Sequence, residues 1–408
     1  MPLVSEVRPE AFEFGNLELA LERARLPLAM IPSLHISGFK LFRDLELPRL
    51  GSLNLFVGKN NTGKTCLLEA VELYASSSPW DVLRVASRRE PEAVQRKKLD
   101  RFDPFETEES LRPLLSLFRR ECGHLHQPYM LLSAGDPESQ LVLRCEPFLD
   151  GILEMEEMTS QSERTEPSPY RGPLGLLLRK GLEISRGVEK SRRQAFERYL
   201  RMPPPPEEMM KEEGWLHPDA APAAFLPARG FSASDAKRLW DKASLADKDE
   251  LLLDWLRFVE PDVRDLRYIS DPDTGVDLPY LKIDGERGRT PLASMGDGLT
   301  HLFHIGLAMA NASGGILLID EFENGLHWEV QEQLWKALFE AATKFGVQVF
   351  ATTHSNDCIQ AFVEARKDRL ISSESYVYRL ERKGENIHAH EFSRQGLEAA
   401  IRQGIEVR

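Results

Sequence analysis

The segment GKNNTGKT, residues 58–65, has the residue types and spacing of a loop that binds phosphate groups. Gly58 and Gly63 let the backbone turn tightly and approach oxygen atoms, while the loop N–H groups point at the phosphates. Lys64 is expected to reach the β- and γ-phosphates of ATP, and Thr65 to offer its hydroxyl to Mg²⁺. The predicted nucleotide contacts are Gly58, Lys59, Asn60, Asn61, Thr62, Gly63, Lys64 and Thr65.

A second polar group ends an apolar stretch in GGILLIDEFENGLH, residues 314–327. The carboxyl end of a strand is where open α/β sheets bind their ligands. We therefore expect Asp320 to hold Mg²⁺, directly or through water. Glu321 is expected to polarise the water that attacks the γ-phosphate.

A third strand pattern, VQVFATTHSND at residues 347–357, also ends in polar residues. His354 lies at its tip, where it could contact the γ-phosphate or the attacking water. The predicted catalytic residues are thus Glu321 and His354, and the predicted metal ligands are Thr65 and Asp320.

The stretch ASMGDGLTHL, residues 293–302, places two glycines just before an apolar helical pattern. Ser294 supplies a hydroxyl, Gly296 permits close backbone approach, and the following helix directs its positive end at an anion. We predict that this stretch contacts nucleotide through Ser294, Gly296, Asp297 and Gly298.

The elements that must position these residues alternate between apolar strands and helices, which indicates a parallel α/β sheet. SLNLFV precedes the phosphate loop and the helical pattern KTCLLEAVELYA follows it. Beyond residue 291 the pattern runs through two more strands, GILLIDE and VQVFATT, each followed by a helix.

The ordered set ISGFKLFRDLEL, GKNNTGKT, ASMGDGL, ILLIDEFENGLH and FATTHS resembles the ATPase heads of the ABC superfamily, nearest its RecF, SMC and OLD-like branch. DEFENGLH and QVFATTHSND look most like stand-alone OLD-type AAA ATPases, which often accompany antiviral effectors. The resemblance covers residue 33 onward, more loosely in the middle. It implies an ABC-type P-loop head with a mixed or parallel sheet and a large, mostly helical insertion.

In this family the segment ASMGD occupies the signature position, where one subunit caps the γ-phosphate bound to another. The resemblance therefore implies a homodimer with two shared ATP sites, able to assemble further. Asn324 and Gly325 would correspond to the loop that crosses the dimer interface.

The signature departs from the usual LSGGQ, because Ala293, Met295 and Asp297 replace Leu, the first Gly and Gln. An acid near a triphosphate is unfavourable unless it faces Mg²⁺, a base of the partner or water. The family also uses a Gln that senses Mg²⁺, and Gln127 and Gln140 remain equal candidates.

Four regions are expected. They are an N-terminal extension (1–32), a first ATPase half with the phosphate loop (33–85), a partly helical insertion (86–285) and a second ATPase half (286–408). The basic stretch 171–201 within the insertion is either a patch for a phosphate backbone or a solvated face of helices.

The formal net charge is −13, so any nucleic-acid contact must be local. The four cysteines show no CxxC spacing, which fits free thiols in a reducing compartment. No apolar run or signal pattern indicates a membrane or secretion, and we expect a cytoplasmic protein.

We therefore expect an ATP-hydrolysing switch that controls a DNA-directed activity or a separate effector or nuclease protein, plausibly in phage defence. The alternatives are an ATP-bound scaffold with negligible turnover that sequesters a toxin or nuclease, and a head of the DNA-repair type.

Overall fold

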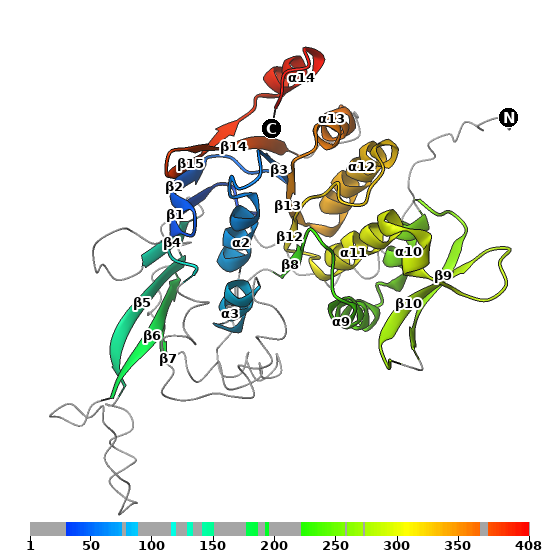
Figure 1. The fold of residues 1–408 in the computed structure, drawn as a ribbon, viewed down its shortest axis with the longest axis horizontal. Coiled ribbons are helices and arrows are strands. Elements are labelled where there is room, and N and C mark those ends of the chain that lie inside the picture. The colour runs from blue at the N-terminus through cyan, green and yellow to red at the C-terminus, as the bar shows by residue number, and fades with distance from the viewer. Residues whose placement is uncertain are drawn as a thin grey trace, which may run out of the picture.

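A computed structural model describes most of the two ATPase halves and parts of the region between them (Figure 1). The described residues are 30–75, 79–88, 116–119, 129–133, 141–150, 177–186, 192–195, 222–257, 259–271, 274–367 and 374–407. Residues 1–29, Gln127 and Gln140 lie outside them.

A six-stranded central sheet organises the molecule, in the order β15-β14-β3-β13-β12-β8. All neighbouring pairs are parallel except β14 with β15. The expected α/β class with a mixed, mostly parallel sheet is confirmed. The strands are β3 (Leu53–Val57), β8 (Ala223–Leu226), β12 (Ile316–Ile319), β13 (Gln348–Thr353), β14 (Ser375–Lys383) and β15 (Asn386–Glu391).

Strands β3, β12 and β13 are buried on both faces, which explains why their sequences read as largely continuous apolar runs. Leu55 and Val57 of β3 point to one core and Phe56 points to the other, as the two-residue period of a strand requires. Helices α2 (Lys64–Ala75) and α3 (Pro79–Ser87) cover the Phe56 face.

The opposite face packs against a larger group of helices (Figure 1). These are α9 (Ala233–Ser244), α10 (Asp249–Arg257), α11 (Asp297–Asn311), α12 (Trp328–Phe345) and α13 (Asn356–Ala365). The last helix, α14 (Arg394–Arg402), adds Leu397 to the same core. No helix of the described residues is long and apolar enough to cross a membrane.

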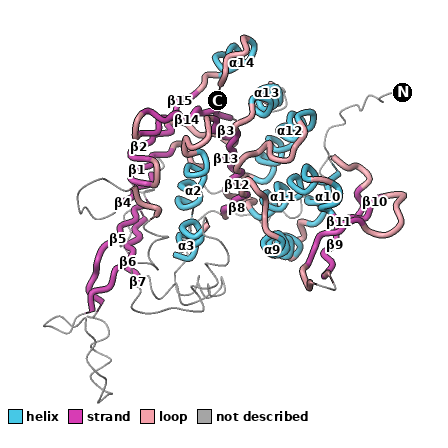
Figure 2. Tube along the Cα trace, viewed as in Figure 1, coloured by secondary structure: helices cyan, strands magenta, loops and turns pink. Residues whose placement is uncertain are grey.

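A second, antiparallel sheet has the order β2-β1-β4-β5-β6-β7, and Figure 2 shows β5, β6 and β7 extending away from the helices. Its strands are β1 (Leu34–Phe39), β2 (Phe42–Leu47), β4 (Tyr129–Ser133), β5 (Leu141–Asp150), β6 (Leu177–Arg186) and β7 (Arg192–Ala195). The basic stretch 171–201 therefore contributes two strands, and its interpretation as helices is wrong for them. Alternating residue types in LLRKGLEISR fit β6 better than a helix.

The region 86–285, expected as an insertion, contributes β8 to the edge of the central sheet. It also contains α9, α10 and two strands of a small sheet in the order β11-β10-β9. These strands are β9 (Val263–Ser270), β10 (Asp277–Ile283) and β11 (Thr290–Pro291), the last lying just beyond the region. The described part of this region thus has more strand than the mostly helical insertion we expected.

Candidate functional site

The phosphate loop, residues 58–65, joins β3 to α2, whose first residue is Lys64. Gly58 and Gly63 have φ values of 151° and 92°, in the range that favours glycine. A Cβ on Gly58 would lie 2.6 Å from the Leu380 carbonyl oxygen, and one on Gly63 would lie 3.0 Å from the Phe42 ring. A side chain at either position would be crowded as well as strained, so glycine lets the loop stay close to its neighbours.

Lys64 is 8% exposed and its ammonium lies within the loop. Its Nζ donates to the carbonyl oxygens of Gly58, at 2.6 Å, and Lys59, at 3.0 Å. Burial lowers the pKa of Lys64, while the charges of Glu321 and Asp320 oppose that effect. A buried ammonium facing carboxylates is positioned to bind an anion that carries a metal ion.

Asp320 connects the phosphate loop to the sheet, because it follows β12 directly. Its Oδ2 accepts a hydrogen bond from the Thr65 hydroxyl at 2.9 Å, and its Oδ1 accepts one from the Thr352 hydroxyl at 2.7 Å. A hydroxyl and a carboxylate this close form the hard oxygen donor set that Mg²⁺ prefers. The residues present therefore fit the metal that the sequence predicts.

Glu321 adopts an unusual backbone conformation, with a φ of 53°. Such a conformation is costly for a residue other than glycine and is often found at functional sites. The Glu321 N–H donates to the Thr352 hydroxyl oxygen at 2.9 Å, which holds the strained backbone in place. Thr352 therefore fixes both Asp320 and Glu321.

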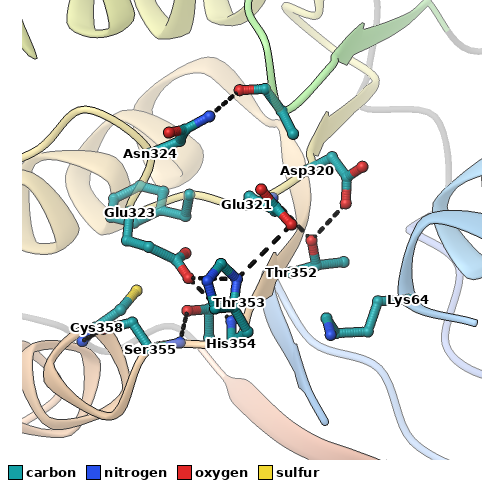
Figure 3. A network of polar contacts seen from close by, with 12 residues as sticks. Lys64, Asp320, Glu321, Glu323, Asn324, Thr352, Thr353, His354, Ser355 and Cys358 are labelled. Atoms are coloured by element: carbon teal, nitrogen blue, oxygen red, sulfur yellow. Dashed lines mark hydrogen bonds and ion pairs between the residues drawn. The ribbon is translucent and has the colours of Figure 1, made fainter. Parts of the chain in front are cut away.

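His354 and two carboxylates lie together at the ends of β12 and β13 (Figure 3). Its Nδ1 is 3.1 Å from Glu323 Oε1 and 3.7 Å from Glu321 Oε1. The structure thus brings the predicted catalytic residues Glu321 and His354 together, beside the Thr65–Asp320 pair.

The signature segment, residues 294–298, is separate from the phosphate loop of its own chain. No hydrogen bond or ion pair of the described residues joins the two segments. Ser294 is exposed and its hydroxyl donates to the Pro291 carbonyl at 2.7 Å. Gly296, with a φ of 99°, has open space where a Cβ would stand, and no side chain caps the N-terminus of α11. This helix start is therefore open to a ligand from outside the chain.

The packing of its own chain explains why residue 298 is a glycine. A Cβ there would lie 2.9 Å from the carbonyl oxygen of Gly325. Gly298 thus lets the start of α11 pack directly against the loop that follows Asp320 and Glu321.

Two histidines of α11 are buried, and the first of them strengthens this connection. His301 Nε2 lies 3.2 Å from the carbonyl oxygen of Phe322, to which its N–H donates. His304 Nδ1 accepts from the Phe231 N–H at 3.3 Å. Burial lowers the pKa of each histidine to about 4, so both are neutral near pH 7.

We expect these histidines to make the fold sensitive to acid. Their pKa is lower in the folded chain (about 4) than in the unfolded one (about 6.5), so the unfolded state binds more protons between those values. The stabilisation is complete above pH 6.5 and is lost as the pH falls through 4, by about 3 kcal/mol for each histidine. Urea unfolding at pH 7 and pH 4.5 measures the loss.

The His304→Gln variant should lose part of this pH dependence, and the matched change at exposed His388 should not. Equal free energies of unfolding at both pH values would contradict the assignment.

Sequence reasoning missed Thr352 and Glu323. Thr352 lies beside Asp320 because Ile319 of β12 pairs with Ala351 of β13, a register between distant segments that local residue types leave open. Lys40 forms an ion pair with buried Glu69 at 2.7 Å. Within the described residues, no group of three His, Cys, Asp or Glu side chains is placed to hold a metal.

Comparison with known families supports the resemblance seen in the sequence. Residues 160–357 match a family described as "AAA domain, putative AbiEii toxin, Type IV TA system", and residues 30–110 match "AAA ATPase domain". These matches confirm that the chain resembles AAA ATPases of the OLD and AbiEii type. The second match spans the phosphate loop, which implies ATP binding there.

A curated relative from Helicobacter pylori, named "ATP/GTP phosphatase", is 22% identical over 392 residues, covering 90% of this chain and 97% of the relative. An uncharacterised protein of Methanocaldococcus jannaschii is 39% identical over 61 residues, 15% of this chain and 28% of its own.

Among solved structures, an SMC head bound to the C-terminal winged-helix domain of ScpA matches with a TM-score of 0.47 and 12% identity, over 91% of this chain and 99% of its own. The SMC head domain from Thermotoga maritima matches with a TM-score of 0.41 and 12% identity, over 88% and 98%.

Proposed function

We propose that the chain is a Mg²⁺-dependent ATPase whose hydrolysis switches a dimer between two states. The observation that carries the proposal is the hydrogen-bonded chain Thr65–Asp320–Thr352 with Glu321 at its end. It joins a phosphate loop to a carboxylate that is available for water. The similarity to an "ATP/GTP phosphatase" over most of the chain supports the same reaction.

The side chains divide the reaction among them. The loop N–H groups and Lys64 bind the β- and γ-phosphates, and Thr65 and Asp320 would hold Mg²⁺, which supplies Lewis-acid stabilisation of the phosphate charge. Glu321 orients a water and takes its proton. The water oxygen bonds to the γ-phosphorus while the bond to the bridging oxygen of ADP breaks, so ADP and phosphate leave.

We propose that the second copy of the chain completes each site. The exposed signature segment has a hydroxyl at Ser294, an unhindered Gly296 and an uncapped helix start. These features suit the γ-phosphate of another subunit, because a helix N-terminus favours an anion. The Asp297 carboxylate opposes this attraction unless it faces Mg²⁺, a basic group or water. Twofold symmetry would give two such sites in one dimer.

Replacing Ser294 with Arg tests the shared site. The bulky side chain should leave ATP binding by one subunit within about threefold of wild type, because Ser294 contacts nothing in its own phosphate loop, and should lower turnover by at least about tenfold. ATP affinity by filter binding and phosphate release measure the two effects. Normal turnover in Ser294→Arg would contradict the shared site.

The signature segment offers a matched control in Ala293, which is also exposed but has no proposed ligand. Ala293→Ser should keep turnover within about twofold of wild type.

The output of the switch is proposed to be a separate effector. One matched family is described with a toxin of a toxin–antitoxin system, which favours an effector protein over direct action on DNA. The same description favours a second candidate, an ATP-bound scaffold that sequesters a toxin and hardly turns over ATP. Phosphate release with ATP and with GTP, in Mg²⁺ and in EDTA, separates the two: the switch predicts metal-dependent release, and the scaffold predicts background rates throughout.

A further inference from the structure

We propose that Glu323 is the positioning residue for His354, and that it orients the ring so that Nε2 accepts a hydrogen bond from the attacking water. The proposal deepens the ATPase function and rests on it for the role of the water. The contact between Glu323 and His354 stands independently of that role.

Glu323 holds both the backbone and the ring of His354. Its Oε1 accepts from the His354 N–H at 2.9 Å and lies 3.1 Å from Nδ1 of the same residue (Figure 3). The Glu323 side chain is 10% exposed, whereas that of His354 is 43% exposed. The Nδ1 edge of the imidazole therefore lies against a nearly buried carboxylate, while the side chain as a whole is partly exposed.

The loop that carries Glu323 is fixed by its neighbour Phe322. The Phe322 N–H donates to the Thr352 carbonyl at 3.0 Å, and its carbonyl accepts from His301. Its buried ring stacks on Trp335 with the ring centres 3.7 Å apart. Hydrogen bonds on both sides of Phe322 hold its backbone in place. They therefore fix the positions of the two neighbouring residues, Glu321 before it and Glu323 after it.

The two carboxylates have different distances to the histidine. Glu323 Oε1 is 3.1 Å from Nδ1, the shorter of the two ion-pair distances, and Glu321 Oε1 is 3.7 Å away. Glu323 is thus the carboxylate placed to accept from the Nδ1–H group, and Glu321 stays available for the water.

This division fixes the tautomer of the neutral ring. With its proton on Nδ1, the imidazole has a lone pair on Nε2, the nitrogen on the opposite edge. Nε2 can then accept one hydrogen of the attacking water while Glu321 accepts the other and receives the proton. Both hydrogens point at acceptors, so an oxygen lone pair is left to face the γ-phosphorus.

The second oxygen of Glu323 indicates that the residue serves more than folding. Among the described side chains, Glu323 Oε2 is buried and has no hydrogen-bond partner. A buried carboxylate oxygen without a partner costs stability, so a carboxylate kept there points to a functional reason.

A double-mutant cycle tests whether Glu323 acts through His354. The Glu323→Gln variant of the full chain should lower kcat by about 10- to 100-fold, the effect typical of losing a residue that orients a functional histidine, and should change the KM for ATP by less than about threefold. In a His354→Ala background the same substitution should change kcat by less than about twofold, because its target is gone.

Glu329→Gln, at an exposed position of α12, is the matched control and should match wild type. The proposal is overturned if the loss of kcat in the double variant equals the product of the losses in Glu323→Gln and His354→Ala. It is also overturned if Glu323→Gln keeps the kcat of the wild type.

Nitrogen NMR of histidine-labelled protein gives a readout that does not need turnover. His354, assigned by its loss in His354→Ala, should show the Nδ1–H tautomer in the wild type and a changed tautomer ratio in Glu323→Gln. An Nε2–H tautomer in the wild type would overturn the proposal. If the wild type releases no phosphate, the proposed function fails and the NMR result still decides the Glu323–His354 contact.

Discussion

Replacing Lys64 with Ala is expected to weaken ATP binding by at least about 100-fold and to bring phosphate release to background. A charged hydrogen bond contributes about 1.5–3 kcal/mol, and Lys64 can make two such bonds to the triphosphate. The ammonium is already inside the phosphate loop, where burial lowers its pKa and nearby carboxylates oppose that effect. Calorimetry with ATP and a phosphate-release assay measure both losses.

Lys64→Met separates charge from packing, since it retains most of the buried stem if Lys64→Ala folds poorly. It should bind ATP as weakly as Lys64→Ala, and Lys336→Ala, a surface change on α12, should behave as wild type. Wild-type affinity in a folded Lys64→Met variant would contradict the role of the ammonium.

Replacing Glu321 with Gln is expected to lower kcat by about 10²- to 10⁴-fold, the range for losing a general base, while ATP affinity changes little. The amide has the same shape as the carboxylate but takes no proton from water. The backbone of residue 321 should stay in place because its N–H still donates to Thr352. Single-turnover phosphate release measures the loss of rate.

The same variant separates the switch from the scaffold. A scaffold predicts equal, near-zero rates for wild type and Glu321→Gln. Glu332→Gln, at a surface position of α12, is the control for a lost carboxylate.

The α/β class and the strand-end position of Asp320 and His354 were predictable from the sequence. Each lies directly after a short apolar run, and parallel strands in register bring such ends to one edge of the sheet. The phosphate loop was equally visible, because its residue types and spacing occur between an apolar strand pattern and a helical one.

Glu323 and Thr352 were not predicted, because their roles depend on contacts between chain segments about thirty residues apart. Glu323 is one of several acids after β12, and only the fold shows that it turns toward His354. The strands of the basic stretch were missed for another reason. The pairing of β6 with β5 and of β7 with β6 decides the conformation, and local residue types leave it open.

Gly298 shows how a motif can have two explanations. Its spacing from Gly296 suggested a ligand contact, whereas its missing Cβ makes room for the Gly325 carbonyl of the same chain. Gly296 has no such neighbour, so the proposed contact with a second subunit depends most on Ser294 and Gly296.

Two copies of the chain are proposed to enclose one ATP between them. Sedimentation of the Glu321→Gln variant, which should bind ATP without hydrolysing it, measures this pairing. In ATP and Mg²⁺ the molar mass of the variant from sedimentation should be twice the mass that it has in ADP. Adding Ser294→Arg to the variant should return the mass in ATP to the one measured in ADP. If the Glu321→Gln variant binds ATP but has the same mass in ATP and in ADP, whether or not Ser294→Arg is added, two copies of the chain do not enclose one ATP.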